Sequence, residues 1–139
     1  HCSVPVRQAE DGDRVLPDQI LVAPGGRHLS LVGRLPLVRV TLTDGPLVSG
    51  HRPSIDMLFQ SAARIYGAAT VGILMTGMGR DGVEGCKKLL DVGGRTFGQD
   101  GPSSVVYGMN KAAFQEGAVS VQFSLEEMPQ VIMRLASEG

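Results

Sequence analysis

The sequence contains no tryptophan, few aromatic residues and only two cysteines, Cys2 and Cys86. The two cysteines lie far apart and form no C-x-x-C pair, which favours a reduced, cytoplasmic setting over a disulfide scaffold. No apolar run approaches the roughly 18 residues that a membrane-spanning helix requires, and no signal-peptide pattern opens the chain. Membrane insertion is therefore not expected.

An excess of one charge and the common ligand motifs are also lacking. The formal net charge is −1 and no basic patch stands out, so neither nucleic acid nor an anionic membrane is an expected partner. The histidines form no H-x-x-x-H or H-E-x-x-H pair, and we therefore expect no metal site and no other cofactor. No G-x-S-x-G elbow is present to expose a serine nucleophile.

The sequence has the length of a single domain and is rich in glycine. The 139 residues are 42% hydrophobic, enough for a single domain over residues 1–139 with a real core. Glycine is about twice as common as average, and the glycines gather after apolar runs. Because the first residue is His1 and not methionine, we expect the sequence to be a piece of a longer protein.

The apolar pattern divides the chain into a strand-rich first part and an alternating second part. Residues 1–50 predict short strands joined by turns, with a hairpin around Gly33-Arg34. From residue 51 helices alternate with strands, which predicts an α/β fold with a parallel sheet that binds ligands at the carboxyl ends of its strands. The expected strands are 4–7, 20–23, 28–32, 37–42, 70–75, 95–98 and 119–123. The expected helices are 54–66, one from Val83 to Gly93-Gly94, one from Ser103 or Ser104 to about 115, and one after Ser124 whose start Pro129 delays.

The segment from Thr76 to Gly82 is the most informative loop. Its three glycines permit a sharp turn between a strand and a helix, and Asp81 stands where that helix begins. Asp81 either caps the helix or has a chemical role, and position alone favours the cap. The same loop reads G-x-G-x-x-G, with Asp100 roughly 20 residues further on, so a dinucleotide-binding oxidoreductase is an alternative.

A second segment of interest is His51-Arg52-Pro53-Ser54. The simpler interpretation is a loop in which Ser54 caps the next helix; the functional one places His51 and Arg52 in a cleft at the strand ends, touching an acidic or amide substrate. Elsewhere, His28 is interpreted as a surface or packing residue. Cys86 falls on the inward face of its helix and is interpreted as core.

Three segments together resemble one family. They are residues 51–56 (HRPSID), 75–82 (MTGMGRDG) and 104–109 (SVVYGM), supported by residues 9–13 and 23–28. In this order they resemble the catalytic domain of the chemotaxis protein-glutamate methylesterases, over nearly the whole chain. The resemblance implies a doubly wound, mostly parallel sheet with an antiparallel hairpin, incomplete at its N-terminal side.

The resemblance also implies an activity and roles for particular residues. The family removes methyl groups from glutamate methyl esters on chemoreceptor signalling helices by a Ser-His-Asp mechanism, and some members deamidate glutamine. Asp81 corresponds to the triad acid, and the backbone N–H of Met78 to an oxyanion donor. The implied partners are the methyl-accepting receptors and a phosphorylatable receiver domain in the parent chain.

Two departures from the family qualify this prediction. The family's serine and histidine both precede the first residue of this chain, so the fragment alone is expected to be inactive. Asn110 also stands where many relatives have proline. A docking module without catalytic activity therefore remains a third alternative.

Overall fold

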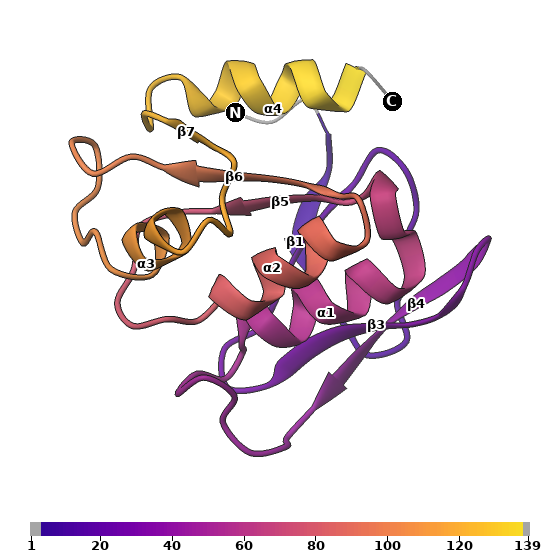
Figure 1. Cartoon of the computed structure of the whole chain (residues 1–139). Coiled ribbons are helices and arrows are strands. Elements are labelled where there is room, and N and C mark those ends of the chain that lie inside the picture. The colour runs from indigo at the N-terminus through magenta and orange to yellow at the C-terminus, as the bar shows by residue number, and fades with distance from the viewer. Residues whose placement is uncertain (1–3, 138–139) are drawn as a thin grey trace.

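The computed structural model describes residues 4–137 (Figure 1). Helices and strands alternate in the second part of the chain, as the sequence predicts. The strands are β1 (Val6–Gln8), β2 (Ile20–Val22), β3 (His28–Arg34), β4 (Leu37–Thr43), β5 (Val71–Leu74), β6 (Arg95–Gln99) and β7 (Val121–Phe123). The helices are α1 (Ile55–Tyr66), α2 (Val83–Asp91), α3 (Met109–Gln115) and α4 (Met128–Ser137), with a 3-10 turn, η1 (Gly67–Ala69).

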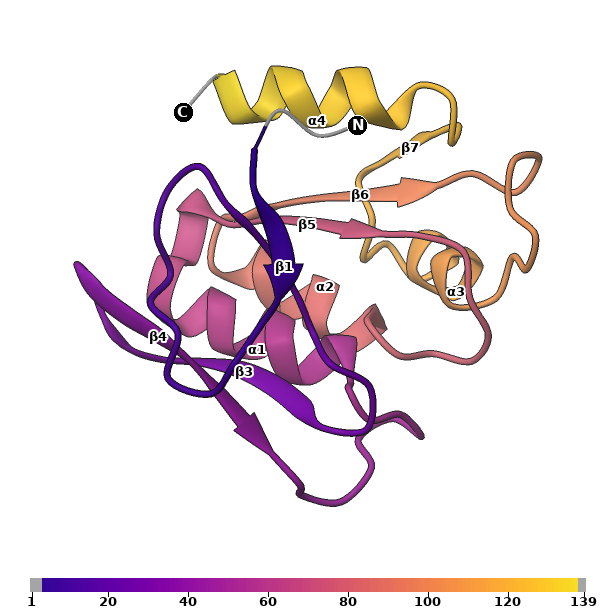
Figure 2. The same cartoon turned by 180° about the vertical axis from the view of Figure 1, so that it is seen from behind.

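The strands form three small sheets. β1 pairs with β2 and β5-β6-β7 pair in that order, both in parallel, whereas β3 and β4 form the expected antiparallel hairpin. The α4 helix lies on one side of the β5-β6-β7 sheet, and α2 and α3 lie on the other (Figures 1 and 2). This is the doubly wound arrangement, with its parallel strands divided between two sheets.

Two apolar clusters hold these layers together. One lies between the β5-β6-β7 sheet and helices α2 and α3, and the other lies beneath the β3-β4 hairpin, where α1 packs. Gly72 of β5 allows close packing of the first cluster, because a Cβ there would stand 2.5 Å from a methyl group of Leu89. Cys86 is fully buried in this cluster, and burial raises the pKa of its thiol to about 12. The prediction that Cys86 is a core residue is confirmed; Cys2 and His1 lie outside the described residues.

The predicted start of the third helix is wrong. The helix begins at Met109, because the serines expected to open it bind Asp100 instead. Ser103 donates its N–H and its hydroxyl to the Asp100 carboxylate, and the Ser104 hydroxyl donates to the Asp100 carbonyl. Residues 100–108 therefore form a folded loop at the carboxyl end of β6.

The last helix begins at Met128, later than its capping-box pattern. Ser124 and Glu127 do form the reciprocal bonds of that box, but they close a turn ahead of the helix. The delayed start that Pro129 indicated is confirmed.

Candidate functional site

The loop of residues 76–82 leaves the carboxyl end of β5 and is held in place by the loop that follows β6. The N–H of Gly77 donates to the Val106 carbonyl over 3.0 Å, and the N–H of Met109 donates to the Gly77 carbonyl over 2.9 Å. The Thr76 hydroxyl donates to the same Val106 carbonyl over 2.7 Å. At Gly108 a Cβ would lie 2.5 Å from the Gly77 oxygen, so the backbones approach closely. Segments distant in sequence therefore form one surface at the strand ends.

Asp81 is buried within this surface, with 2% of its area exposed. Its Oδ1 accepts hydrogen bonds from the Ser54 hydroxyl (2.7 Å) and the Asp56 N–H (3.0 Å), and its Oδ2 accepts one from the Ile55 N–H (2.7 Å). These donors belong to the N-terminus of α1, whereas the N-cap of α2 is Gly82. Asp81 thus caps a helix, but not the helix that it precedes, which corrects the simpler interpretation.

Asp56 makes the reverse contact and was not singled out from the sequence. It is also 2% exposed, and its Oδ1 accepts the N–H groups of Gly82 (3.0 Å) and Gly85 (2.7 Å) at the start of α2. Its Oδ2 accepts the Ser49 hydroxyl over 2.6 Å. Asp81, just before α2, therefore accepts N–H groups at the start of α1, and Asp56 of α1 accepts N–H groups at the start of α2. Each carboxylate lies at the positive end of a helix dipole, where a negative charge is stabilising.

Ser54 contacts both Asp81 and His28, but the three residues do not form a catalytic triad. The Ser54 N–H donates to His28 Nδ1 over 3.2 Å, so the His28 Nε2–H donates to the Pro46 carbonyl over 2.7 Å. The Ser54 hydroxyl points to Asp81 and not to the imidazole. Since Ser54 is 2% and His28 1% exposed, both are buried structural groups, and Ser54 is the N-cap of α1 as predicted.

The two residues predicted to contact substrate, His51 and Arg52, have different surroundings in the structure. The His51 ring lies against the 76–82 loop, where its Cε1 is 3.5 Å from the position that a Cβ at Gly79 would take. Its Nδ1 is hydrogen-bonded to the Ser49 carbonyl. Arg52 instead donates to the Gly45 carbonyl over 3.1 Å. Met78 projects from the same loop with 72% of its area exposed. The strand-end surface therefore includes His51 and Met78, and Arg52 lies on the neighbouring loop.

The groups required for dinucleotide binding are already occupied. A dinucleotide phosphate needs the free N–H groups of the helix that follows the glycine loop, and here Asp56 takes those of Gly82 and Gly85. The acid that would hold the ribose, Asp100, is bonded to Ser103. The G-x-G-x-x-G match is therefore structural.

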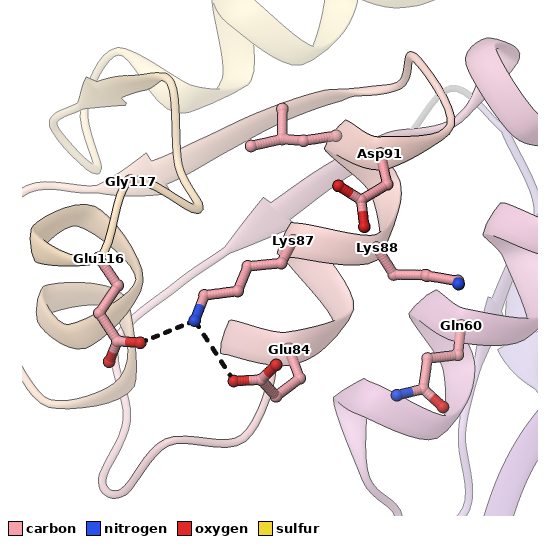
Figure 3. A pocket seen from close by; sticks show the side chains of 8 residues that line it. Gln60, Glu84, Lys87, Lys88, Asp91, Glu116 and Gly117 are labelled. Carbon is pink, nitrogen blue, oxygen red and sulfur yellow. Dashed lines mark hydrogen bonds and ion pairs between the residues drawn. The ribbon is translucent and has the colours of Figure 1, made fainter.

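A polar pocket of about 500 Å³ lies beside α2, away from Asp81 (Figure 3). Lys87 points from α2 towards Glu116 and Glu84, with nitrogen–oxygen distances of 2.9 Å and 3.4 Å. Arg80, from the 76–82 loop, pairs with the same Glu116. These partners, Arg80 above all, lower the pKa of Glu116 to about 2. The cluster ties the loop to the end of α3.

Residues 4–137 contain neither a metal-binding cluster nor a membrane-spanning helix. Within that range, no group of three or more histidine, cysteine, aspartate or glutamate side chains is placed to hold a metal ion. No helix in the same range is long and apolar enough to cross a membrane.

Comparison with known proteins identifies the family. A family model described as CheB methylesterase matches residues 1–132. The chain belongs to the CheB methylesterase family. The CheB resemblance proposed from the sequence is thereby confirmed, and with it the α/β fold class.

Two curated relatives and one solved structure illustrate the match. The chain is 46% identical over 132 residues to a protein-glutamate methylesterase/protein-glutamine glutaminase of Dechloromonas aromatica, covering 95% of this chain and 37% of that protein. A protein of the same name from Treponema denticola is 47% identical over 137 residues, covering 99% of this chain and 37% of the relative. The Thermotoga maritima CheB methylesterase catalytic domain superimposes with a TM-score of 0.88 at 32% identity, covering 96% of this chain and 69% of that one. The chain thus spans little more than a third of the curated CheB relatives.

Proposed function

We propose that this chain supplies Asp81 as the acid of a Ser-His-Asp triad in a protein-glutamate methylesterase. The observation that carries the proposal is the bonding of the Asp81 carboxylate. A carboxylate has about four lone-pair sites, and the α1 donors use two on Oδ1 and one on Oδ2. We assign the second site on Oδ2, for which the structure shows no donor within residues 4–137, to an imidazole N–H. A triad aspartate needs this combination of burial, fixed orientation and one acceptor site turned to the histidine.

The serine and histidine come from sequence outside this chain. The chain covers 69% of the Thermotoga maritima catalytic domain, which leaves room for further strands. Ser54, which donates to Asp81, and His28, which accepts from the Ser54 N–H, are both committed to structural bonds. The triad is therefore completed by another segment of the protein.

The reaction is hydrolysis of a glutamate methyl ester. The serine hydroxyl attacks the ester carbonyl while the histidine takes its proton, and the proton then passes to the departing methanol. Water attacks the acyl-enzyme in the same way and releases the glutamate carboxylate. Asp81 fixes the imidazole tautomer and stabilises the imidazolium that forms in both steps. The same series of steps on a glutamine carboxamide releases ammonia in place of methanol, which accounts for glutamine deamidation.

The 76–82 loop contributes the oxyanion donor. The ester carbonyl is neutral in the bound substrate and becomes anionic only as the bond to serine forms, so a donor placed for the anion lowers the barrier itself. We assign this role to the backbone N–H of Met78, at the sharp turn after β5. The positive φ angle of 79° at Gly79 allows that turn. His51, packed against the loop, lines the substrate side, with Arg52 at its margin.

The substrate is a methylated chemoreceptor. The family and the names of the relatives support a protein glutamate methyl ester as the substrate. Methyl-accepting chemoreceptor signalling helices as partners, a receiver domain elsewhere in the parent chain and a cytoplasmic location are proposed from the family resemblance. A docking module without catalysis has no separate observation in its favour.

A comparison of the full-length protein with the 139-residue chain tests this proposal. Methanol release from methylated receptors is expected from the full-length protein and not from the chain alone, because the proposal places the nucleophile and base outside the chain. Turnover by the chain that a serine-directed reagent abolishes would contradict the assignment. Lack of activity in the full-length protein would favour the docking module.

A further inference from the structure

We propose that Asp56 is a positioning residue for the reaction, because it caps α2 in place of Asp81 and so leaves Asp81 free to face the triad histidine. This inference rests on the proposed methylesterase function. Asp56 is outside the proposed triad and acts on it only through Asp81.

The position of Asp81 poses a physical conflict. It immediately precedes the helix cap Gly82, so its carboxylate lies close in sequence to the free N–H groups and the positive end of α2, which attract a carboxylate. A bond to those N–H groups would take the carboxylate away from its donors on α1. In the structure the Asp81 carboxylate instead faces the start of α1.

Asp56 resolves this conflict by occupying the N-terminus of α2 itself. Its Oδ1 accepts both the Gly82 and the Gly85 N–H, so neither group remains free to attract the Asp81 carboxylate. The backbone N–H of Asp56 also donates to Asp81 Oδ1 over 3.0 Å. One residue therefore satisfies N–H groups at the start of α2 and also helps to hold the Asp81 carboxylate at the start of α1.

The surroundings of Asp56 are built around its carboxylate. A Cβ at Gly85 would lie 2.7 Å from the Phe59 Cβ and 3.1 Å from Asp56 Oδ1, so a side chain at residue 85 would displace the carboxylate. Ser49, whose hydroxyl donates to Oδ2, has a φ angle of 52°, which is uncommon for a residue other than glycine. A buried carboxylate is unfavourable unless it is fully hydrogen-bonded, and here backbone and hydroxyl donors meet that requirement.

The test is a mutant cycle in the full-length protein, with kcat and KM measured on methylated receptors and folding followed by thermal denaturation. Asp56→Ala is expected to lower kcat by about 10²-fold, the effect of a small misplacement of a catalytic group, with KM little changed. Asp56→Asn is expected to restore kcat to within about tenfold of wild type, because its amide oxygen can still accept from Gly82 and Gly85. Asp91→Ala, which removes an exposed carboxylate at the other end of α2, is the matched control and is expected to be unchanged.

The double mutant distinguishes positioning from a stabilising cap. If Asp56 acts through Asp81, adding Asp56→Ala to Asp81→Asn causes no further loss of kcat. A variant Asp56→Ala that lowers the melting temperature but keeps the wild-type kcat per folded molecule overturns the proposal. So does a double mutant in which the two losses multiply.

Two further outcomes have separate meanings. Unchanged activity in Asp81→Asn would overturn the proposed triad role of Asp81 and this inference with it, whereas loss in Asp81→Asn with none in Asp56→Ala overturns this inference alone. If Asp56→Ala does not fold, Asp56→Ser replaces it in the cycle, because a serine hydroxyl is too short to reach both Gly82 and Gly85. The same kcat loss and the same non-additivity with Asp81→Asn are then expected, and their absence overturns the proposal.

Discussion

Replacing Asp81 with alanine should destabilise the 139-residue chain far more than the loss of an ordinary surface carboxylate. The substitution removes the acceptor of three hydrogen bonds, two of them from the backbone N–H groups of Ile55 and Asp56. The Ser54 hydroxyl can rotate to another partner, but the two backbone donors cannot. An unsatisfied buried donor costs about 1–3 kcal/mol, and the lost charge at a helix N-terminus adds up to about 1 kcal/mol.

The expected loss is therefore about 3–5 kcal/mol, after allowance for the relief of burying a charge. Asp81→Asn keeps one acceptor oxygen and should lose only about 1–2 kcal/mol. Asp100→Ala is the matched control, because Asp100 also follows a strand but binds only Ser103 through its carboxylate. It should lose about 1 kcal/mol, as for an ordinary cap.

Urea unfolding followed by far-UV circular dichroism measures these differences in a chain without tryptophan. A domain of this size is stable by roughly 5–15 kcal/mol, so a loss of this size lowers the midpoint by about 2 M at m near 2 kcal/mol/M. The reasoning is refuted if Asp81→Ala falls within about 0.5 kcal/mol of Asp100→Ala, a difference no larger than for unrelated surface substitutions. Asp81 would then not be the acceptor that holds the start of α1.

Three further predictions concern packing, acid stability and association. Gly85→Ala should destabilise the chain by about 1–3 kcal/mol in the same assay although alanine favours helix, because its methyl group would overlap Phe59; a gain in stability would show that α1 and α2 can move apart. Glu116 has a folded pKa of about 2 against an ordinary value of 4.5, so its contribution to stability is present above about pH 4.5 and disappears as the pH falls towards 2. Glu116→Gln should therefore be less stable than wild type at pH 7 and equal to it near pH 2, and a constant difference would refute the pairing with Arg80 and Lys87. Finally, the outer edges of β2 and β5 have no described partner strand within residues 4–137, so the isolated chain should self-associate and bind an apolar dye; a monomer without dye binding in light scattering would contradict this.

The sequence predicted the elements whose signals are local. The apolar runs and their periods predicted β5, α1 and α2, and Ser54 was correctly predicted as the cap of α1. The third helix was misplaced because Ser103 and Ser104 are equally suited to a turn, and only the position of Asp100 decides between the two.

The residues of the proposed site could be selected from the sequence only where their signals are local, and their roles stay predictions. Asp81, Met78 and His51 were selected because each lies in a recognisable short segment. Asp56 could not be assigned a role, because its partners are 26 and 29 residues away and a cap supplied by another helix has no local pattern. His28 was interpreted as a surface or packing residue, and only the fold shows that it is buried with both ring nitrogens bonded.

The most direct test of the central claim is esterase activity of the full-length protein, wild type against Asp81→Asn. The amide keeps the size of the side chain and one acceptor oxygen, so the protein should fold, while the carboxylate that orients and stabilises the imidazole is lost. A loss of kcat of roughly 10⁴-fold is predicted, as for a triad aspartate replaced by its amide. Unchanged activity in a folded Asp81→Asn variant would contradict the account and would leave Asp81 as the cap of α1 alone.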